Sequence, residues 1–400
     1  MQKNKSQKTK HLSYIEISKK NLMHNIKQFR AVLGKKTKIS AVVKTNAYGY
    51  GDKEVVRILA PYADYFQVNS VEELERIRPL TKKPILVLGY VCKNDLKRAI
   101  KLGCTISAFD LAHLLMINVQ AQKLGIKVKV HIAVDSYLGR EGFMPNDLIK
   151  IIPELKKLKN IKIDGVYAHF ANIEDIHSTN STSSWQASSG PLATNFSHAQ
   201  KQIDSYEKVL KVFKENGFGD LKTHISATSG ILAYEKWKGI HSIARLGIGL
   251  YGMWPSEELE KMWKKKISLK PALRYITHIA QIKTLPVGHS IGYGLTYVTK
   301  KETKIAVIPQ GYADGLTRSL SNNGFVLICG MRAPILGRIS MNMLVVDVSH
   351  IKGVKIEDEV VILGTQKSNT ITAEELAQNM GTINYEVTTH LSPLLPRVIK

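Results

Sequence analysis

Cysteine is scarce in this sequence, with only Cys92, Cys104 and Cys329 among 400 residues. The three lie far apart and form no CxxC pair and no spacing typical of a zinc site. The sequence therefore excludes a disulfide scaffold and predicts no metal site. Cysteines that stay reduced act as small apolar residues and suit a reducing compartment, so we expect a cytoplasmic protein.

Long hydrophobic runs are also absent. No uninterrupted apolar stretch reaches the roughly 20 residues that a membrane-spanning helix needs. The first ten residues, MQKNKSQKTK, are charged, but no apolar stretch of the kind found in signal peptides follows them. We expect no membrane partner, and we expect residues 1–12 to be a basic, disordered N-terminus.

Acidic residues are few, with 33 Asp and Glu against 57 Lys and Arg, for a net charge of +24. Such a balance could attract nucleic acid or another anionic partner. The lysines are scattered, however, and no basic helix is interleaved with aromatic residues. Dispersed lysine is typical of a solvated surface, so we expect no nucleic-acid partner.

Short β-like runs alternate with amphipathic helical patterns over residues 13–260. Repeated βα units predict parallel strands with helices outside, and about eight units fit an α/β fold of the (β/α)8 TIM-barrel type. The expected strands are 14–17, 39–43, 65–68, 85–88, 104–108, 128–134, 165–169, 223–226 and 244–248. The expected helices are 20–33, 53–59, 71–77, 111–124, 148–158 and 198–216.

The alternation ends near Pro255, and residues 261–400 predict a mainly β domain with one helix. Its expected strands are 275–282, 304–309, 324–329, 343–348 and 359–363, and its helix is 372–380. Residues 176–197 are rich in Ser, Thr, Asn and Gly, which predicts a long loop of unassigned role.

The segment KISAVVKTNAYGYG (38–51) carries the first candidate site. An apolar run ends on Lys44, and the carboxyl ends of barrel strands carry the chemistry in this architecture. A lysine desolvated by Val42 and Val43 would have a lowered pKa and could form an imine with an aldehyde. Taken alone, a lysine at a strand end is more often a solvated surface charge.

The whole segment resembles the cofactor motif of the alanine racemase family, and further motifs follow in the same order over about residues 12–400. The resemblance implies that Lys44 binds pyridoxal 5′-phosphate and that Tyr48 contacts its phosphate. It further implies an isomerase that interconverts L- and D-alanine and supplies D-alanine for the peptidoglycan of the cell wall.

A second motif, SIGYGLTY (290–297), places Tyr293 at the family's second catalytic base. Racemisation removes a proton from one face of the α-carbon and returns one to the other, so two groups on opposite faces are the simplest solution. The resemblance gives these roles to Lys44 and Tyr293. Tyr312, in PQGYADGLTR, resembles a tyrosine at the substrate entrance.

The motif IARLGIGLYG (243–252) places Arg245 against the pyridine nitrogen of the cofactor. Arginine stays protonated and can only donate, so that nitrogen would remain unprotonated. By the same resemblance the amides of Gly247 and Ile248, together with Ser229, would bind phosphate. His169 would hydrogen-bond Arg245.

Two further motifs concern the substrate carboxylate. Arg140, in VHIAVDSYLGREGF, matches the arginine that grips it, and Met341, in GRISMNM, matches a residue whose amide contacts it. Many alanine racemases hold this arginine with a carbamylated lysine, where this chain has Ala133, and carry an aspartate where it has Asn342. These two departures resemble broad-specificity amino-acid racemases acting on Ser, Lys or Arg, which remain the alternative.

The resemblance also implies a head-to-tail homodimer, in which Tyr293, Tyr312 and Met341 serve the partner's site. Arg245 argues against a decarboxylase of the same fold, which usually places an acidic group on the pyridine nitrogen. The C-terminal domain argues against a non-enzymatic pyridoxal-phosphate carrier. A zinc-dependent lyase would need a cysteine near His390, and the sequence has none there.

Overall fold

The computed structural model describes residues 11–173, 197–233 and 241–400. The basic segment 1–12 and the Ser/Thr-rich segment 176–197 therefore lie almost wholly outside the described residues.

The chain divides into two compact units. The first, called the barrel unit below, comprises Asn21–Thr45 and Val55–Lys270. The second, called the β unit, comprises the residues up to Lys20, Asn46–Glu54 and Pro271–Lys400.

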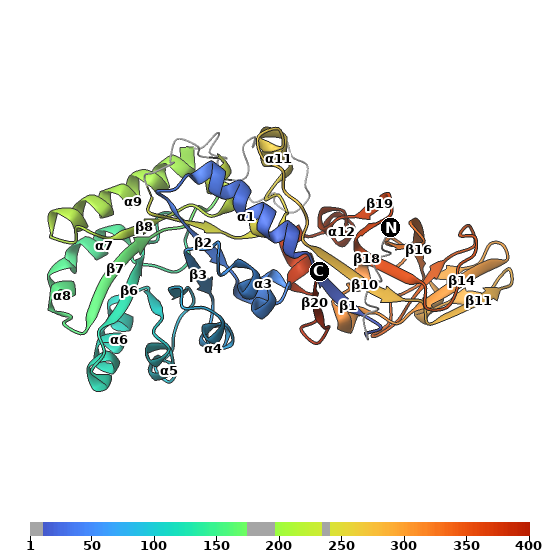
Figure 1. Ribbon diagram of the computed structural model, residues 1–400, viewed down its shortest axis with the longest axis horizontal. Helices are drawn as coiled ribbons and strands as arrows, with labels where there is room; N and C mark the ends of the chain where they lie inside the picture. Colours follow the sequence, from blue (N-terminus) through green and yellow to red (C-terminus); the bar gives the residue numbers. More distant parts are fainter. Residues whose placement is uncertain (1–10, 174–196, 234–240) are drawn as a thin grey trace, which may run out of the picture. The chain divides into compact units, whose positions relative to one another are not determined.

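The barrel unit is built on eight parallel strands in the spatial order β8-β7-β6-β5-β4-β3-β2-β9 (Figure 1). Between the end strands, Thr223 N–H donates to Ser242 Oγ (2.8 Å) and Arg245 N–H donates to the Ser226 carbonyl (3.1 Å), so the barrel is nearly closed. The expected TIM-type barrel is confirmed. The strands are β2 (Lys38–Val42), β3 (Tyr65–Val68), β4 (Ile85–Val87), β5 (Thr105–Ala108), β6 (Val128–Ala133), β7 (Ile161–Tyr167), β8 (Lys222–His224) and β9 (Ile243–Leu246).

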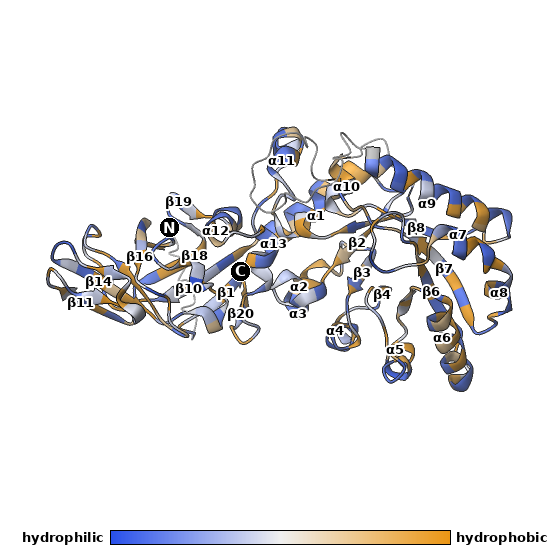
Figure 2. Cartoon of the chain, turned by 180° about the vertical axis from the view of Figure 1, so that it is seen from behind, coloured by the Kyte–Doolittle hydropathy of each residue, from blue (hydrophilic) through white to orange (hydrophobic). Residues whose placement is uncertain are grey.

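Helices lie outside these strands, and hydrophobic residues concentrate along β6 and β7 (Figure 2). The ends of α6 show why the local sequence forms them: the Asp110 side chain accepts from His113 N–H (2.7 Å), and Gly125 closes the helix at φ 63°. The helices along this part of the chain are α1 (Lys19–Leu33), α3 (Asp52–Leu59), α4 (Val71–Ile77), α5 (Leu96–Lys101), α6 (Leu111–Leu124), α7 (Pro145–Lys150), α8 (Ile152–Lys157), α9 (Ser197–Glu215), α10 (Thr228–Ala233) and α11 (Glu257–Trp263).

The prediction of one continuous helix over 148–158 is wrong. The structure has two helices, α7 and α8, which meet at Ile151 (φ −91°, ψ 4°). Pro153 lies at the start of α8, where its missing N–H costs nothing, but the same proline could not donate within a continuous helix. The periodicity of apolar residues persists across the break, which is why the pattern predicted one helix.

The β unit contains a ten-stranded sheet in the order β11-β14-β17-β16-β15-β18-β10-β1-β20, with β19 on β18, and a two-stranded sheet of β12 and β13. The expected mainly β domain is confirmed. Its strands are β1 (Tyr14–Ile17), β10 (Leu273–His278), β11 (Gln281–Leu285), β12 (Ser290–Ile291), β13 (Tyr297–Val298), β14 (Thr303–Ile308), β15 (Phe325–Ile328), β16 (Met331–Leu336), β17 (Leu344–Asp347), β18 (Glu359–Gln366), β19 (Asn369–Ile371) and β20 (Arg397–Ile399). Helices α12 (Ala373–Met380) and α13 (Asn384–Thr389) complete it.

Strand β1 joins the two ends of the chain. It pairs antiparallel with β10, with Tyr14 opposite Ile276, and parallel with β20, with Ile15 opposite Arg397. We predicted this strand from the sequence but assigned it to the barrel, because the pattern of apolar and polar residues along a strand does not reveal which strand it pairs with. The expected strand 275–282 is also two strands in the structure. Before Ile279 the residues of β10 pair with β18, and after it the residues of β11 pair with β14.

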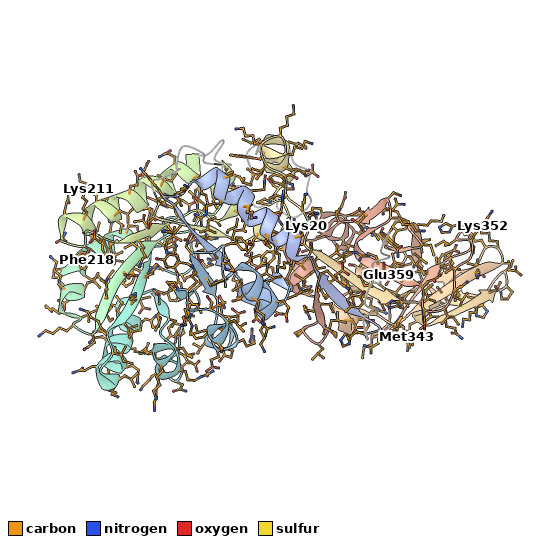
Figure 3. The ribbon with its side chains drawn as sticks, in the orientation of Figure 1. Lys20, Lys211, Phe218, Met343, Lys352 and Glu359 are labelled. Carbon is orange, nitrogen blue, oxygen red and sulfur yellow. The ribbon has the colours of Figure 1, made fainter. Side chains whose placement is uncertain are left out.

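The surface lysines are dispersed in the described residues, as the sequence suggested. Figure 3 labels Lys20 on α1, Lys211 on α9 and Lys352 in the connection between β17 and β18, and all three are exposed. Lys211 lies 3.9 Å from Glu215 one turn along α9. Such exposed pairs stabilise a helix by only a few tenths of a kcal/mol, about 0.3–0.5.

Candidate active site

Lys44 lies two residues beyond the last residue of β2, at the carboxyl end of the barrel strands. The preceding residue, Val43, donates its N–H to the Gln67 carbonyl near the end of β3 (2.8 Å). This hydrogen bond fixes the backbone as far as the residue before the lysine. Burial lowers the pKa of Lys44, the positive charge of Arg140 lowers it further, and the Glu73 carboxylate acts in the opposite direction. A lowered pKa enlarges the fraction of neutral amine, which is the nucleophilic form.

The turn after Lys44, labelled α2 (Lys44–Tyr48), is left-handed. Thr45, Asn46, Ala47 and Tyr48 have φ of 55°, 51°, 53° and 56°. This conformation costs an ordinary L-residue about 1–2 kcal/mol, so four in succession need support from their surroundings. Backbone strain of this kind concentrates at functional sites.

Glu73 supplies part of that support, and the sequence analysis missed it. Its carboxylate is buried and accepts hydrogen bonds from Thr45 N–H (2.5 Å) and Asn69 N–H (2.6 Å). Charge-assisted bonds of this type are stronger than neutral ones. The only local signal is Ser70, whose hydroxyl caps α4 by accepting from Glu73 N–H (3.3 Å).

Tyr48 lies in the β unit, with its ring centroid 6.2 Å from that of Tyr385 on α13. The next residue, Gly49, has φ 86°, and a Cβ there would lie 1.9 Å from the Thr388 carbonyl oxygen. Arg397 donates to the Gly49 carbonyl (2.8 Å from Nη2). The tyrosine is thus carried on a segment that only glycine allows to pack against α13.

Thr228 organises the residues expected to bind phosphate. Its hydroxyl accepts from Gly247 N–H (3.2 Å) and Gly249 N–H (3.3 Å). Ile248 lies between these two, and its N–H has no hydrogen-bond partner among the described residues. Ser229 is buried beside Thr228 at the start of α10. The sequence therefore folds into two adjoining turns that leave a backbone donor available for an anion.

Gly249→Ala is expected to destabilise this turn. A Cβ at position 249 would lie 2.5 Å from the Phe29 ring and 2.8 Å from Thr228 Cγ2. Overpacking of this kind costs about 1–3 kcal/mol, which chemical denaturation would measure. Gly219→Ala is the matched control, because nothing lies within 4 Å of its Cβ position. Equal stability of the two variants would contradict this packing.

Arg245 is 4% exposed, and its guanidinium forms no hydrogen bond or ion pair with a carboxylate of the described residues. Its guanidinium donates to the carbonyls of Ala168 (2.8 Å) and Ile225 (2.7 Å) and to ring nitrogens of His169 (Nδ1, 2.9 Å) and His224 (Nδ1, 3.1 Å). Burial lowers the pKa of Arg245 to about 10, so it stays charged at neutral pH. Burial and the Arg245 charge hold the pKa of His169 well below its usual value, so His169 accepts as a neutral ring.

Arg140 is carried on a loop that returns to the end of β6. The Asp135 carboxylate accepts from the N–H groups of Leu138 (2.9 Å), Gly139 (2.9 Å) and Arg140 (3.1 Å). Phe143 closes the loop by donating its N–H to the Ala133 carbonyl (2.9 Å). The loop is therefore braced by its own first residue, a buried aspartate.

Ala133 provides no charge near Arg140, and Glu141 does. The Arg140 guanidinium donates to both Glu141 oxygens, from Nε at 2.5 Å and from Nη2 at 3.0 Å. Both side chains are substantially exposed, 58% and 39%, so the pair contributes little to folding. The pair orients the Arg140 side chain. Because Glu141 holds one edge of the guanidinium, the remaining N–H groups point together away from that edge.

Three motifs of the β unit meet around residues 337–343. Tyr312 N–H donates to the Ser340 carbonyl (3.1 Å), and Ala313 N–H donates to the Met341 carbonyl (2.9 Å). A Cβ on Gly292, next to Tyr293, would lie 3.2 Å from the Arg338 amide. Tyr293, Tyr312 and Met341 are thus brought onto neighbouring segments.

These β-unit side chains are strongly exposed. Tyr293 is 71% exposed, Met341 57% and Tyr312 44%. Asn342, next to Met341, donates its side-chain amide to Asp314 Oδ2 (3.4 Å). No described residue of the same chain covers the phenol that the sequence analysis proposed as a catalytic base.

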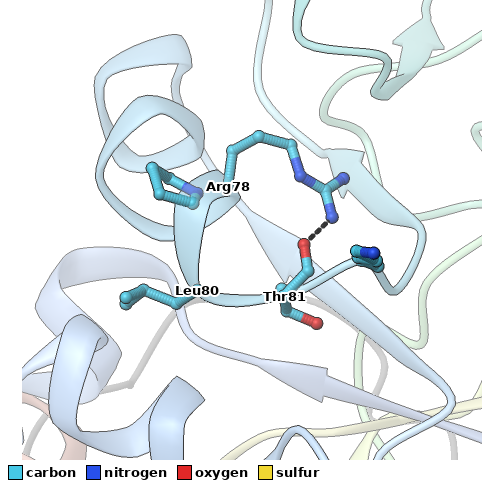
Figure 4. Close-up of a pocket in the computed structure, with 5 residues that line it drawn as sticks. Arg78, Leu80 and Thr81 are labelled. Carbon is cyan, nitrogen blue, oxygen red and sulfur yellow. Dashed lines mark hydrogen bonds between the residues drawn. The ribbon is translucent and has the colours of Figure 1, made fainter.

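A surface depression outside this region is lined by Arg78, Pro79, Leu80, Thr81 and Lys82 (Figure 4). The Arg78 guanidinium donates to the carbonyls of Thr81 and Lys83, so this cation is already hydrogen-bonded to the backbone. Within the described ranges no three His, Cys, Asp or Glu side chains are grouped as metal ligands. Every helix in the described part of the chain is too short or too polar to cross a membrane.

Comparison with known proteins assigns both units. Residues 17–255 match the family described as alanine racemase, N-terminal domain, and residues 272–399 match alanine racemase, C-terminal domain. Alanine racemase 2 of Caldanaerobacter subterraneus is 34% identical over 387 residues, covering 96% of this chain and 94% of the relative. Alanine racemase of Methanococcus maripaludis is 35% identical over 392 residues, covering 97% and 98%.

The solved structure of alanine racemase from Clostridium difficile 630 has a TM-score of 0.88 at 32% identity, and the match covers 98% of this chain and 97% of that one. Because these relatives are all named alanine racemases, the broad-specificity alternative suggested by Ala133 and Asn342 is not favoured. Since family matches cover both units and the relatives span nearly the full length, the chain belongs to the alanine racemase family.

Proposed function

We propose that this chain interconverts L- and D-alanine, with pyridoxal 5′-phosphate bound to Lys44. The observation that carries the proposal is the amine of Lys44, which burial and Arg140 shift toward its neutral form at the carboxyl ends of the barrel strands. A neutral amine can bond covalently to an aldehyde. Alanine as substrate is inferred from the named relatives.

The donors in the structure suit this cofactor. The Lys44 amine would bond its aldehyde, and the buried Arg245 guanidinium would donate to its ring nitrogen. The unpaired Ile248 N–H and the Ser229 hydroxyl would bind its phosphate, with Tyr48 as a further donor. When bound, pyridoxal phosphate withdraws electrons from the α-carbon of the amino acid and acidifies its C–H bond.

Arg245 favours racemisation over other reactions of the same cofactor. Its guanidinium can only donate, so it would oppose protonation of the nitrogen it faces and temper electron withdrawal. Its four hydrogen bonds to protein groups hold it in place. This arrangement favours the prompt return of a proton over loss of carbon dioxide or of the amino group.

Two side chains would move the α-proton. The Lys44 amine would accept or return it on one face, and the Tyr293 phenol on the other. Arg140, oriented by Glu141, would hold the substrate carboxylate, and the Met341 amide would add a donor. Tyr312 would line the entrance for the substrate.

The decisive experiment supplies the purified protein with pyridoxal phosphate and single L-amino acids. Chiral chromatography then measures the D-enantiomer formed from alanine, serine, lysine and arginine. We expect D-alanine to form fastest. Equal rates on all four amino acids would favour the broad-specificity alternative, and no D-amino acid from any would overturn the proposal.

We also propose a homodimer in which a second copy covers the exposed face of the β unit. A proton-transferring phenol works best shielded from bulk water, and Tyr293 is 71% exposed in one chain. Exposed apolar side chains in such number mark an interaction surface. The large apolar or aromatic residues concerned are Tyr293, Leu295, Val298, Tyr312, Met341 and Met343.

Met343→Glu is expected to weaken this dimer at least about tenfold, because it would bury a charge among apolar groups. Sedimentation would show the shift, and activity lost on dilution should return at high protein concentration. Val287→Glu, at a position 67% exposed in another loop, is the control and should change neither. A monomer with full activity would contradict the proposal.

We place the enzyme in the cytoplasm, where it would supply D-alanine for peptidoglycan. The support is chemical: all three cysteines are unpaired, as suits a reducing compartment.

A further inference from the structure

A continuous row of buried polar side chains runs through the barrel away from Arg245. Arg245 Nη1 lies 3.1 Å from His224 Nδ1, and His224 Nε2 lies 2.9 Å from His131 Nδ1. His131 Nε2 faces Asp164 Oδ2 at 3.9 Å, and Lys222 forms an ion pair with the same oxygen. The row crosses β9, β8, β6 and β7, and the first four residues are at most 6% exposed.

Asp164 reaches this row because β7 contains a bulge. Val130 of β6 pairs with Ile163, but the next residue, His131, pairs with Gly165, so Asp164 is the extra residue in the ladder. Bulges redirect a side chain and are common beside active sites. Gly165 completes the arrangement, because a Cβ there would lie 2.8 Å from the His131 ring.

The ionisation of the row follows from its surroundings. Contacts with His131 and Lys222 hold the pKa of Asp164 well below its usual range, so it is an anion at neutral pH. Burial lowers the pKa of His131 and of His224, so both rings are neutral. Lys162 also lies near Asp164, with Nζ 3.5 Å from Oδ1.

These charges allow one arrangement of protons. Arg245 can only donate, so His224 Nδ1 must accept and the proton of that ring lies on Nε2. His131 Nδ1 then accepts from His224 Nε2, which leaves the His131 proton on Nε2, facing the Asp164 carboxylate. Both hydrogen bonds, and the His131 N–H that faces the carboxylate, therefore point from the buried cation toward the buried anion.

The His224 ring is also held by its neighbours. The Tyr167 ring stacks on His224 with centroids 4.9 Å apart and planes 2° apart. The Tyr206 phenol accepts from the backbone N–H of His224 (3.1 Å) and donates to the Val166 carbonyl (2.6 Å), which anchors the backbone that carries this ring. A stacked ring on an anchored backbone resists rotation, so His224 keeps Nδ1 toward Arg245 and Nε2 toward His131.

We propose that Asp164 and His131 are positioning residues for Arg245. They fix the Nε2–H form of His224, so that its Nδ1 accepts from Arg245, and they supply through two neutral rings the negative charge that this buried guanidinium lacks in direct contact. The inference rests on the proposed function, in which Arg245 donates to the cofactor ring. It goes beyond that function by adding two residues that touch neither cofactor nor substrate.

Asp164→Asn tests the proposal, since it removes the charge and lets a side-chain amide donate to His131. The protein without cofactor is labelled with ¹⁵N-histidine, and the protonated ring nitrogens of His131 and His224 are identified by NMR. We expect Nε2–H on both rings in the unaltered protein and a gain of Nδ1–H in the variant. Asp64→Asn is the control, because Asp64 is also a strand-flanking carboxylate in ion pairs but lies outside the row.

Kinetics of the loaded enzyme supply the second measurement. We expect kcat for alanine to fall roughly tenfold to a hundredfold in Asp164→Asn, because the variant removes the negative charge that the His131 N–H faces, with KM nearly unchanged. Asp64→Asn should change neither. An unaltered protein with His224 protonated on Nδ1, or Asp164→Asn with unchanged ring protons and kcat, would overturn the proposal.

The NMR measurement on the unaltered protein needs no variant to fold and no activity. It therefore separates the two hypotheses. Absence of D-alanine formation would contradict the proposed function alone, whereas a His224 ring protonated on Nδ1 would contradict the positioning role alone.

Discussion

Lys44→Ala is expected to reduce racemisation of alanine by at least about 10³-fold, since it removes both a proton-transferring amine and the covalent attachment of the cofactor. The amine is suited to attachment because burial lowers its pKa below the 10.5 of an ordinary lysine. For a cationic acid this shift means more neutral amine at every pH below 10.5. Chiral chromatography measures the activity.

Borohydride reduction followed by mass spectrometry locates the attachment. In the unaltered protein the added mass should lie on the peptide that contains Lys44, and in Lys44→Ala it should be absent. Lys53→Ala is the matched control, because Lys53 is exposed on α3, a few residues along the chain. Full activity or an equal mass increase in Lys44→Ala would rule out this lysine as the attachment point.

Tyr293→Phe is the second change with a large expected effect. It keeps the ring and removes the phenol, so one of the two proposed proton-transfer groups is lost. General acid–base groups contribute about 10²–10⁴-fold, and racemisation should slow by that factor. Tyr297→Phe lies in the same hairpin but packs beside the apolar cluster of Leu285 and Ile291, and it should leave the rate unchanged.

Solvent deuterium distinguishes loss of a base from loss of structure. In D₂O, Tyr293→Phe should still exchange the α-proton of one enantiomer through Lys44, faster than it inverts the configuration. Proton NMR follows the exchange, and chiral chromatography follows the inversion. A variant in which both enantiomers still exchange and invert at the original rate would remove Tyr293 from the mechanism.

Several features could be predicted because they depend on residues close together in the chain. Helices α4 and α6 have the predicted bounds, since a capping side chain such as Asp110 and a closing glycine such as Gly125 act within one turn. The predicted end of the strand before Lys44, at Val43, is one residue from the observed end of β2, because an apolar run followed by polar residues and glycine ends a buried strand.

Other site features were missed because their signals are not local. Glu73 is one of several glutamates in VEELERI, and only its position beneath the turn after Lys44 distinguishes it. The role of Glu141 was not predicted either, because it depends on the direction in which the Arg140 side chain points. The left-handed turn was also missed, since Thr, Ala and Tyr rarely adopt that conformation and no propensity indicates it.

By itself, the sequence determined the alternation of strands and helices, the change to a mainly β domain and the motifs that identify the family. Each of these follows from hydrophobic periodicity, capping or a short ordered motif. Only the tertiary structure decided that β1 belongs to the β unit, that Asp164 is the extra residue of a bulge, and that His131 meets His224 across 93 positions. Such contacts depend on which faces are buried together, and burial is a property of the folded chain as a whole.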